Sequence, residues 1–152
     1  MTVSTSISAT SFTSRYGNPT VDYKGAHIRA HCRHVATVVT ISGRIDASNV
    51  DRVTDLAKRY ILSDKPFVLD LSGVSSFTPQ ATRLLFTLDD LCQAAGVDWA
   101  LVVSDAVSRR LRVRNTDVLF PVVGSEAQAL HQFDDAILNR RRFLLPLLSK
   151  TA

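Results

Sequence analysis

The feature that most constrains the fold of this chain is an apolar segment followed directly by a helix start. Residues 67–71 read Phe-Val-Leu-Asp-Leu, a run typical of a buried strand, and we expect the Ser72-Gly73 turn to end it. Thr78-Pro79 then predicts a helix N-terminus. The threonine hydroxyl can accept a hydrogen bond from a free backbone N–H, and the N–H that proline lacks has no partner there anyway. In α/β proteins, helix starts at the carboxyl ends of strands usually form the working surface.

Alternating patterns on both sides of this segment predict an α/β domain. Residues 26–32 and 35–42 read as two strands, which we expect to pair antiparallel at an edge. Gly43 ends the second strand, and Asp46 or Ser48 is expected to cap the helix that follows. Strands and helices then alternate, which predicts a mixed, mostly parallel sheet of about five strands flanked by about four helices. The remaining expected elements are strands at 99–103 and 119–123 and helices at 78–95, 104–111 and 125–137.

Composition suggests one domain with extensions at both ends. The chain has 152 residues, 45% of them hydrophobic, which suffices for one core. We predict a disordered Ser/Thr-rich arm at 1–20, the folded domain at 21–139 and a basic and apolar tail at 140–152. The tail, with its apolar residues at 143–148, is expected to pack on the core or on a second copy, with peripheral membrane contact as a weaker alternative.

The sequence contains neither a membrane span nor a secretion signal, so we predict a cytoplasmic protein. Cys32 and Cys92 form no close-spaced motif, and we expect both to be buried thiols. We predict no metal site, because His27 and His31 lack partners at a ligand-like spacing. No cofactor is expected, and no pairing of nucleophile and base suggests an enzyme.

Three segments resemble the STAS domain of bacterial anti-sigma factor antagonists. Residues 39–46, Val-Thr-Ile-Ser-Gly-Arg-Ile-Asp, resemble the family's Leu-x-Gly-Glu-Leu-Asp signature. Residues 68–74 resemble its central strand, and residues 104–111 with 119–122 resemble its late helix and last strand. The resemblance covers residues 26–133 and implies a STAS fold.

The resemblance also implies a function in signalling and transcription regulation. An antagonist of this kind binds a kinase-type anti-sigma factor and frees a sigma factor, until the kinase phosphorylates a serine in an Asp-Ser-Ser/Thr-Gly motif. Here Thr78 aligns with the Asp, Pro79 with the phosphorylated Ser, Gln80 with the next Ser/Thr and Ala81 with the Gly. A shift by one residue puts Gln80 on the phosphorylated position, so neither register leaves a hydroxyl there. We therefore predict an antagonist-like module that lacks the usual phosphorylatable serine.

The residues predicted to bind the partner follow from these motifs. They are Asp46, Ser75, Ser76, Thr78, Pro79, Gln80, Arg83 and Ser104. Thr78, Ser76 and Ser75 are also the candidates for a relocated phosphorylation site, with Ser75 and Ser76 read as loop residues. Arg109, Arg110, Arg112 and Arg114 are interpreted as a solvated helix face and not as a phosphate or nucleic-acid grip.

Two alternative functions stay open. One is a STAS-type sensor that binds a nucleotide or a lipid-like ligand in the crevice at the strand ends. The other is an oligomeric signalling scaffold, in which the tail at 140–152 forms a homodimer.

Overall fold

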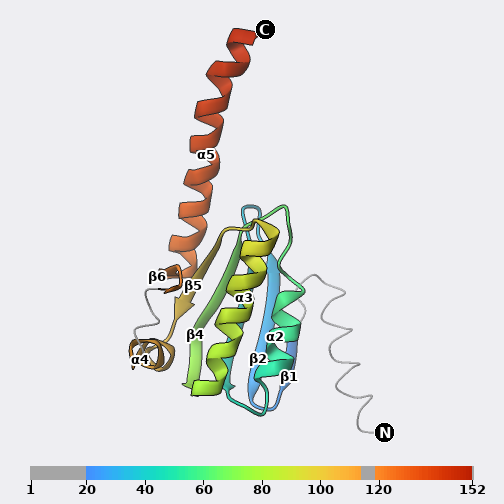
Figure 1. Ribbon diagram of the computed structural model, residues 1–152, viewed down its shortest axis with the longest axis vertical. Helices are drawn as coiled ribbons and strands as arrows, with labels where there is room; N and C mark the ends of the chain where they lie inside the picture. Colours follow the sequence, from blue (N-terminus) through green and yellow to red (C-terminus); the bar gives the residue numbers. More distant parts are fainter. Residues whose placement is uncertain (1–19, 114–118, 152) are drawn as a thin grey trace, which may run out of the picture.

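The computed structural model describes residues 20–113 and 119–151, with side chains up to residue 142 (Figure 1). It contains one six-stranded sheet in the order β1-β2-β3-β4-β5-β6. The strands are β1 (Thr20–Tyr23), β2 (Ala26–Cys32), β3 (Thr37–Ile45), β4 (Phe67–Phe77), β5 (Trp99–Val103) and β6 (Val122–Val123). The helices are α2 (Val50–Lys58), the short 3-10 helix η1 (Pro79–Ala81), α3 (Thr82–Ala95), α4 (Asp105–Val113) and α5 (Glu126–Thr151).

The sheet is mixed and mostly parallel, as the alternation of elements predicts. β1, β2 and β3 pair antiparallel, whereas β3, β4, β5 and β6 pair parallel. The sheet has one strand more than the expected number of about five, because β1 was not predicted: only its first residue, Thr20, lies in the predicted arm, and the other three lie in the predicted domain without an assigned element. Thr20 begins this strand, which is only four residues long and therefore gives little periodic signal. The rest of the predicted arm lies outside the described residues.

The two faces of the sheet are covered differently. α2 and α3 lie over one face (Figure 1), where Phe67, Leu69 and Leu85 belong to the main core. Each such side chain stabilises the fold by roughly 1.5–3 kcal/mol through burial. On the other face a smaller cluster joins Val68 and Val102 to Ala129 near the start of α5, and Leu130 and Phe133 pack against it. The first turns of α5 therefore close the second layer.

β4 is longer than the sequence suggested. The expected turn at Ser72-Gly73 is wrong, because the strand continues to Phe77 and stays paired with β3. Two register shifts between β3 and β4 accommodate this polar half of the strand. Ser75 and Ser76 are consequently strand residues, and their interpretation as loop residues is also wrong.

The predicted helix starts are nearly right in position but wrong in their hydrogen bonds. Thr78 precedes η1, yet its hydroxyl makes no capping bond, is buried and has no hydrogen-bond partner. The Ala81 N–H donates to the backbone oxygen of Thr78 instead, at 3.0 Å. The residue before α2 is Asn49, so neither Asp46 nor Ser48 caps that helix. Proline at the first position of η1 already fixes the backbone, so that turn forms without the side-chain cap.

α5 runs as a helix from Glu126 to Thr151 and thus crosses the boundary predicted at residue 140. The expected packing of the apolar residues at 143–148 concerns side chains outside the described part. Within the part that is described, no helix has both the length and the apolar character required to cross a bilayer.

Of the two thiols predicted to be buried, only Cys92 is so. Cys32 is exposed, because it lies beyond the last core residue of β2, Ala30.

Candidate functional site at the strand ends

The carboxyl ends of β3 and β4 bring most of the predicted partner-binding residues together. Ile45 and Phe77 are register partners, and the Thr78 N–H donates to the Ile45 oxygen at 3.2 Å. Asp46 and Thr78, the residues that follow these strands, therefore lie side by side. We use the term strand-end surface for the set Asp46, Ser75, Ser76, Thr78, Pro79, Gln80 and Arg83.

A compact loop holds Asp46 at this surface. Its carboxylate accepts hydrogen bonds from the backbone N–H of Ser48 at 2.9 Å and from the Ser48 hydroxyl at 2.5 Å. These bonds, chiefly the one from the Ser48 hydroxyl, hold the pKa of Asp46 below its ordinary value of 3.8, although partial desolvation acts in the opposite direction. Asp46 is therefore an anion at neutral pH, fixed in orientation by its own loop.

Asn49 supports this loop and was missed by the sequence reasoning. Its buried side chain donates to the oxygens of Arg44 at 2.9 Å and Lys24 at 3.1 Å, and it accepts from the Asp46 N–H at 3.0 Å. Asn49 thus ties the end of β3 to the turn between β1 and β2. An Asn just before a helical pattern is the signal that could have pointed to it, since Asn favours helix starts.

η1 and the first turn of α3 present three exposed residues: Pro79, Gln80 and Arg83. The Arg83 guanidinium donates to the Gln80 backbone oxygen at 3.4 Å and lies 3.5 Å from the carboxylate of Asp51 in α2. Both charged side chains of that pair are more than half exposed, so the pair is screened and contributes little stability. Arg83 is therefore available to a partner at low energetic cost.

The three predicted phosphorylation candidates differ in access. Ser75 is exposed and donates its hydroxyl to the Gly43 oxygen at 3.1 Å. Ser76 is half-buried opposite Arg44 on β3. The Thr78 hydroxyl is buried, so a kinase would have to open this strand end to reach it.

Ser104 lies on the neighbouring strand end, after β5, where its hydroxyl accepts from the Val107 N–H of α4 at 3.3 Å. A polar hollow at the carboxyl ends of β4 and β5 joins Ser104 to Ser75 and to two further residues, Ser72 and Arg109. The structure thus places Ser104 next to the strand-end surface, on the side of Ser75.

Two arginines of α4 belong to this region, although the sequence suggested only a solvated face. Arg109 lines the polar hollow, and the Arg110 guanidinium donates to the Phe77 oxygen at 3.2 Å. Arg109 and Arg110 also line a second hollow beside Ser76. No local motif marks these arginines, because their neighbours come from β4, about 33 residues earlier.

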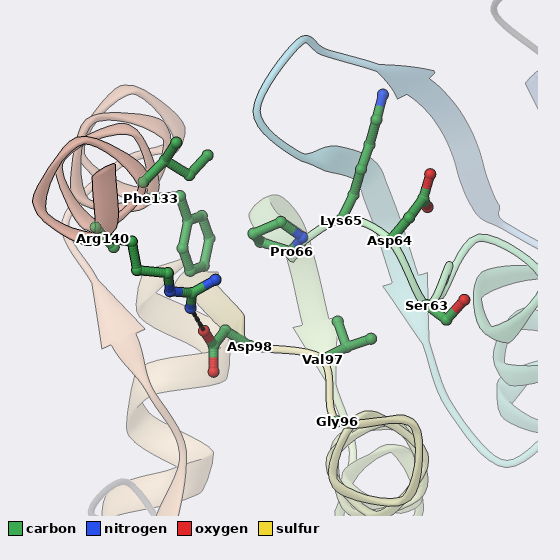
Figure 2. Close-up of a pocket in the computed structure, with 11 residues that line it drawn as sticks. Ser63, Asp64, Lys65, Pro66, Gly96, Val97, Asp98, Phe133 and Arg140 are labelled. Carbon is green, nitrogen blue, oxygen red and sulfur yellow. Dashed lines mark ion pairs between the residues drawn. The ribbon is translucent and has the colours of Figure 1, made fainter. Parts of the chain in front are cut away.

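A third cavity lies at the other end of the sheet, between α5 and the segments that lead into β4 and β5 (Figure 2). Pro66, Val97 and Phe133 line it with apolar surface, and at its edge Arg140 lies 3.8 Å from Asp98. It sits at the amino ends of the strands, away from the strand-end surface.

The described residues contain no group of three or more His, Cys, Asp or Glu side chains placed to hold a metal ion. His27, which invites a metal interpretation, has its ring nitrogen 2.5 Å from the carboxylate of Asp22. Burial lowers the pKa of His31, which favours its neutral form at pH 7.

Comparison with known proteins identifies the class of domain. Residues 27–129 match the STAS domain family, and the chain belongs to it. This result confirms the resemblance found in the sequence motifs and the mixed α/β fold.

A particular relative is similar over nearly the whole chain. "Osmosensory protein A" of Mycobacterium tuberculosis is 48% identical over 155 residues, which cover 99% of this chain and 98% of that protein.

Two solved structures share the fold. An anti-sigma factor antagonist from Mycobacterium paratuberculosis superposes with a TM-score of 0.62 at 18% identity, covering 72% of this chain and 94% of that one. A variant of RsbS from Moorella thermoacetica gives a TM-score of 0.61 at 19% identity, covering 72% and 97%. Identities this low establish the common architecture only.

Proposed function

We propose that this STAS domain is a non-enzymatic, cytoplasmic bacterial regulator that binds a kinase-type anti-sigma factor through the strand-end surface. Binding would free a sigma factor for transcription. The family membership supports this class of function, and the two solved structures support the fold that would carry it. The name of the relative, with 48% identity, supports osmotic stress as the upstream condition.

One observation carries the proposal. The strand ends form an ordered surface on which Pro79, Gln80 and Arg83 are exposed. The position that the family phosphorylates aligns with Pro79, or with Gln80 in the shifted register, and neither residue has a hydroxyl. Proline has no hydroxyl to accept phosphate and no N–H to stabilise one at a helix start. Binding at this surface is therefore proposed to persist in the presence of the partner kinase.

The binding test uses purified anti-sigma factors from the same organism and isothermal titration calorimetry. Arg83→Glu should weaken binding at least about tenfold, the effect of losing one well-placed interface residue. Arg59→Glu is the matched control, because Arg59 is exposed at the far end of α2. Loss of binding in both variants, or in neither, would contradict the assignment of the surface.

The switch test adds ATP to the same complex and maps phosphate by mass spectrometry. Wild type should carry none at residues 75–80, whereas Pro79→Ser should gain it if the kinase tolerates Thr78 in place of the motif's Asp. Phosphate on Thr78, Ser75 or Ser76 in wild type would show that the switch has moved.

The polar hollow favours one alternative, a ligand sensor. Ser72, Ser75, Ser104 and Arg109 offer hydroxyls and a cation to an anionic group such as a nucleotide phosphate. A thermal-shift screen with nucleotides distinguishes the two functions, because a sensor should be stabilised by its ligand.

A further inference from the structure

The net positive charge of this protein comes from the C-terminal end of α5. The whole chain carries 18 basic and 14 acidic residues, a net charge of +4. Residues 136–152 contain four basic residues and no acidic one, so residues 1–135 contain 14 of each and sum to zero. A neutral body with a cationic extension indicates an anionic partner for the extension.

α5 leaves the body of the domain where this charged segment begins. Ala129 is fully buried, and Phe133 and Ile137 are half-buried, whereas Leu138 is 44% exposed. The ion pair of Arg140 with Asp98, drawn in Figure 2, lies at the edge of the cavity beneath the helix. Beyond it the helix continues to Thr151 and projects past the sheet in Figure 1. Eleven further residues correspond to about 16 Å of helix.

The arginines at the start of the projection are accessible. Arg140, Arg141 and Arg142 are all exposed, and the Arg140–Asp98 contact of 3.8 Å is long and more than 70% exposed on both sides. Such a pair yields readily to a stronger anionic partner. The three arginines are consecutive, so their side chains lie about 100° apart around the helix. They form a cationic cluster that surrounds the helix where it leads away from the domain.

The sequence after the cluster is apolar. Residues 143–148 read Phe-Leu-Leu-Pro-Leu-Leu, five large apolar residues in six positions. This run is far shorter than the roughly 20 residues needed to span a bilayer. Basic residues joined to a short apolar helical segment are typical of helices that lie in the membrane interface.

Charge also argues against a second copy as the partner. Two copies of residues 136–152 would bring eight basic residues together, four from each, with no acidic side chain in either segment to offset them. An anionic lipid surface supplies the missing negative charge and an apolar layer beneath it.

We propose that the end of α5, from Arg140 onward, binds the surface of a membrane that contains anionic lipids, with the arginines on the headgroups. This interaction does not depend on the anti-sigma factor proposal, since it uses the opposite end of the domain. Its electrostatic part must weaken as ionic strength rises, because the screening length falls from about 10 Å at 0.1 M to about 3 Å at 1 M salt.

The test is flotation of the full chain with vesicles of phosphatidylcholine alone or mixed with phosphatidylglycerol. Binding should require phosphatidylglycerol and decrease at high salt. The double variant Arg141→Gln/Arg142→Gln should lower the partition coefficient at least about tenfold, given the attraction per basic residue near such a surface. The control Arg52→Gln/Arg59→Gln removes the same charge from exposed positions of the α2 region and should bind like wild type.

Circular dichroism on the same samples measures the unfolding temperature of each variant, and light scattering measures its oligomeric state. Both double variants should unfold at the wild-type temperature, because all four arginines are exposed. The proposal is overturned if wild type does not float with anionic vesicles, if it floats equally with neutral ones, or if both variants lose binding alike. A wild-type chain that forms a dimer by light scattering and does not bind vesicles would also overturn the proposal.

Discussion

Gly43 offers the sharpest test of how this fold builds its strand-end surface. It lies in β3 with φ +89°, in the region that favours glycine. A Cβ atom placed there would lie 2.2 Å from the backbone oxygen of Gly25. That same oxygen accepts the Arg44 N–H at 2.9 Å, so the two backbones are held together at this point. The chain cannot relieve the contact without giving up that hydrogen bond.

The expected cost of Gly43→Ala is the sum of three effects. Left-handed backbone costs an alanine about 1–2 kcal/mol. Overpacking against rigid backbone adds about 1–3 kcal/mol, and the lost hydrogen bond about 1 kcal/mol. We therefore expect the free energy of unfolding to fall by roughly 3–6 kcal/mol, a large part of the stability of an ordinary domain.

Gly96→Ala is the matched control, because Gly96 shares the positive φ of Gly43 but has no close neighbour. Gly96 ends α3 with φ +68°, and a Cβ there would meet nothing within 4 Å. Its substitution should cost only the backbone strain, about 1–2 kcal/mol.

Urea unfolding followed by tryptophan fluorescence measures both variants. Equal losses of stability would refute the argument, because they would show that the close approach of Gly43 to Gly25 is not rigid. The Gly43 oxygen also accepts the Ser75 hydroxyl. Anti-sigma factor binding should therefore weaken in Gly43→Ala even under conditions where the protein is folded, and should be unchanged in Gly96→Ala.

Two further predictions concern titratable groups. Burial, with a smaller contribution from Asp89, raises the pKa of the Cys92 thiol to about 12. A thiol reagent at pH 8 should therefore modify Cys32 alone in the native protein and both cysteines in urea. Intact mass measures the modification, and equal rates for the two cysteines in the native protein would contradict the burial of Cys92. Ser48→Ala should raise the pKa of Asp46, followed by its carboxyl NMR shift, because the largest cause of its lowered value is the Ser48 hydroxyl. A carboxyl whose pKa is lowered by folding stabilises the fold above its ordinary value of 3.8 and loses that contribution as pH falls through the folded value. The stability difference between wild type and Ser48→Ala should therefore be full near pH 7 and shrink below pH 3.8, and a difference that grows on acidification would contradict this sign.

Hydrophobic periodicity in the sequence predicted the strands and α-helices that follow β1, and their order. β2 and β5 have the predicted limits, and α3 ends at Gly96 as expected. These signals are local, since an apolar run lies within a single strand and a periodic apolar stripe lies within a single helix. The STAS resemblance and the family of the chain followed from the same local motifs.

Only the tertiary structure decided where β4 ends and what surrounds its end. Ser72–Phe77 alternates too weakly to be recognised as a strand, yet its backbone N–H and C=O groups pair with β3. The role of Arg110 likewise depends on a carbonyl in another element, that of Phe77. A buried backbone N–H or C=O group must form a hydrogen bond, and its partner can come from a residue that is distant in the sequence. A local sequence pattern contains no information about such a partner. Local motifs therefore identified the residues of the strand-end surface, whereas tertiary packing determined how those residues are arranged.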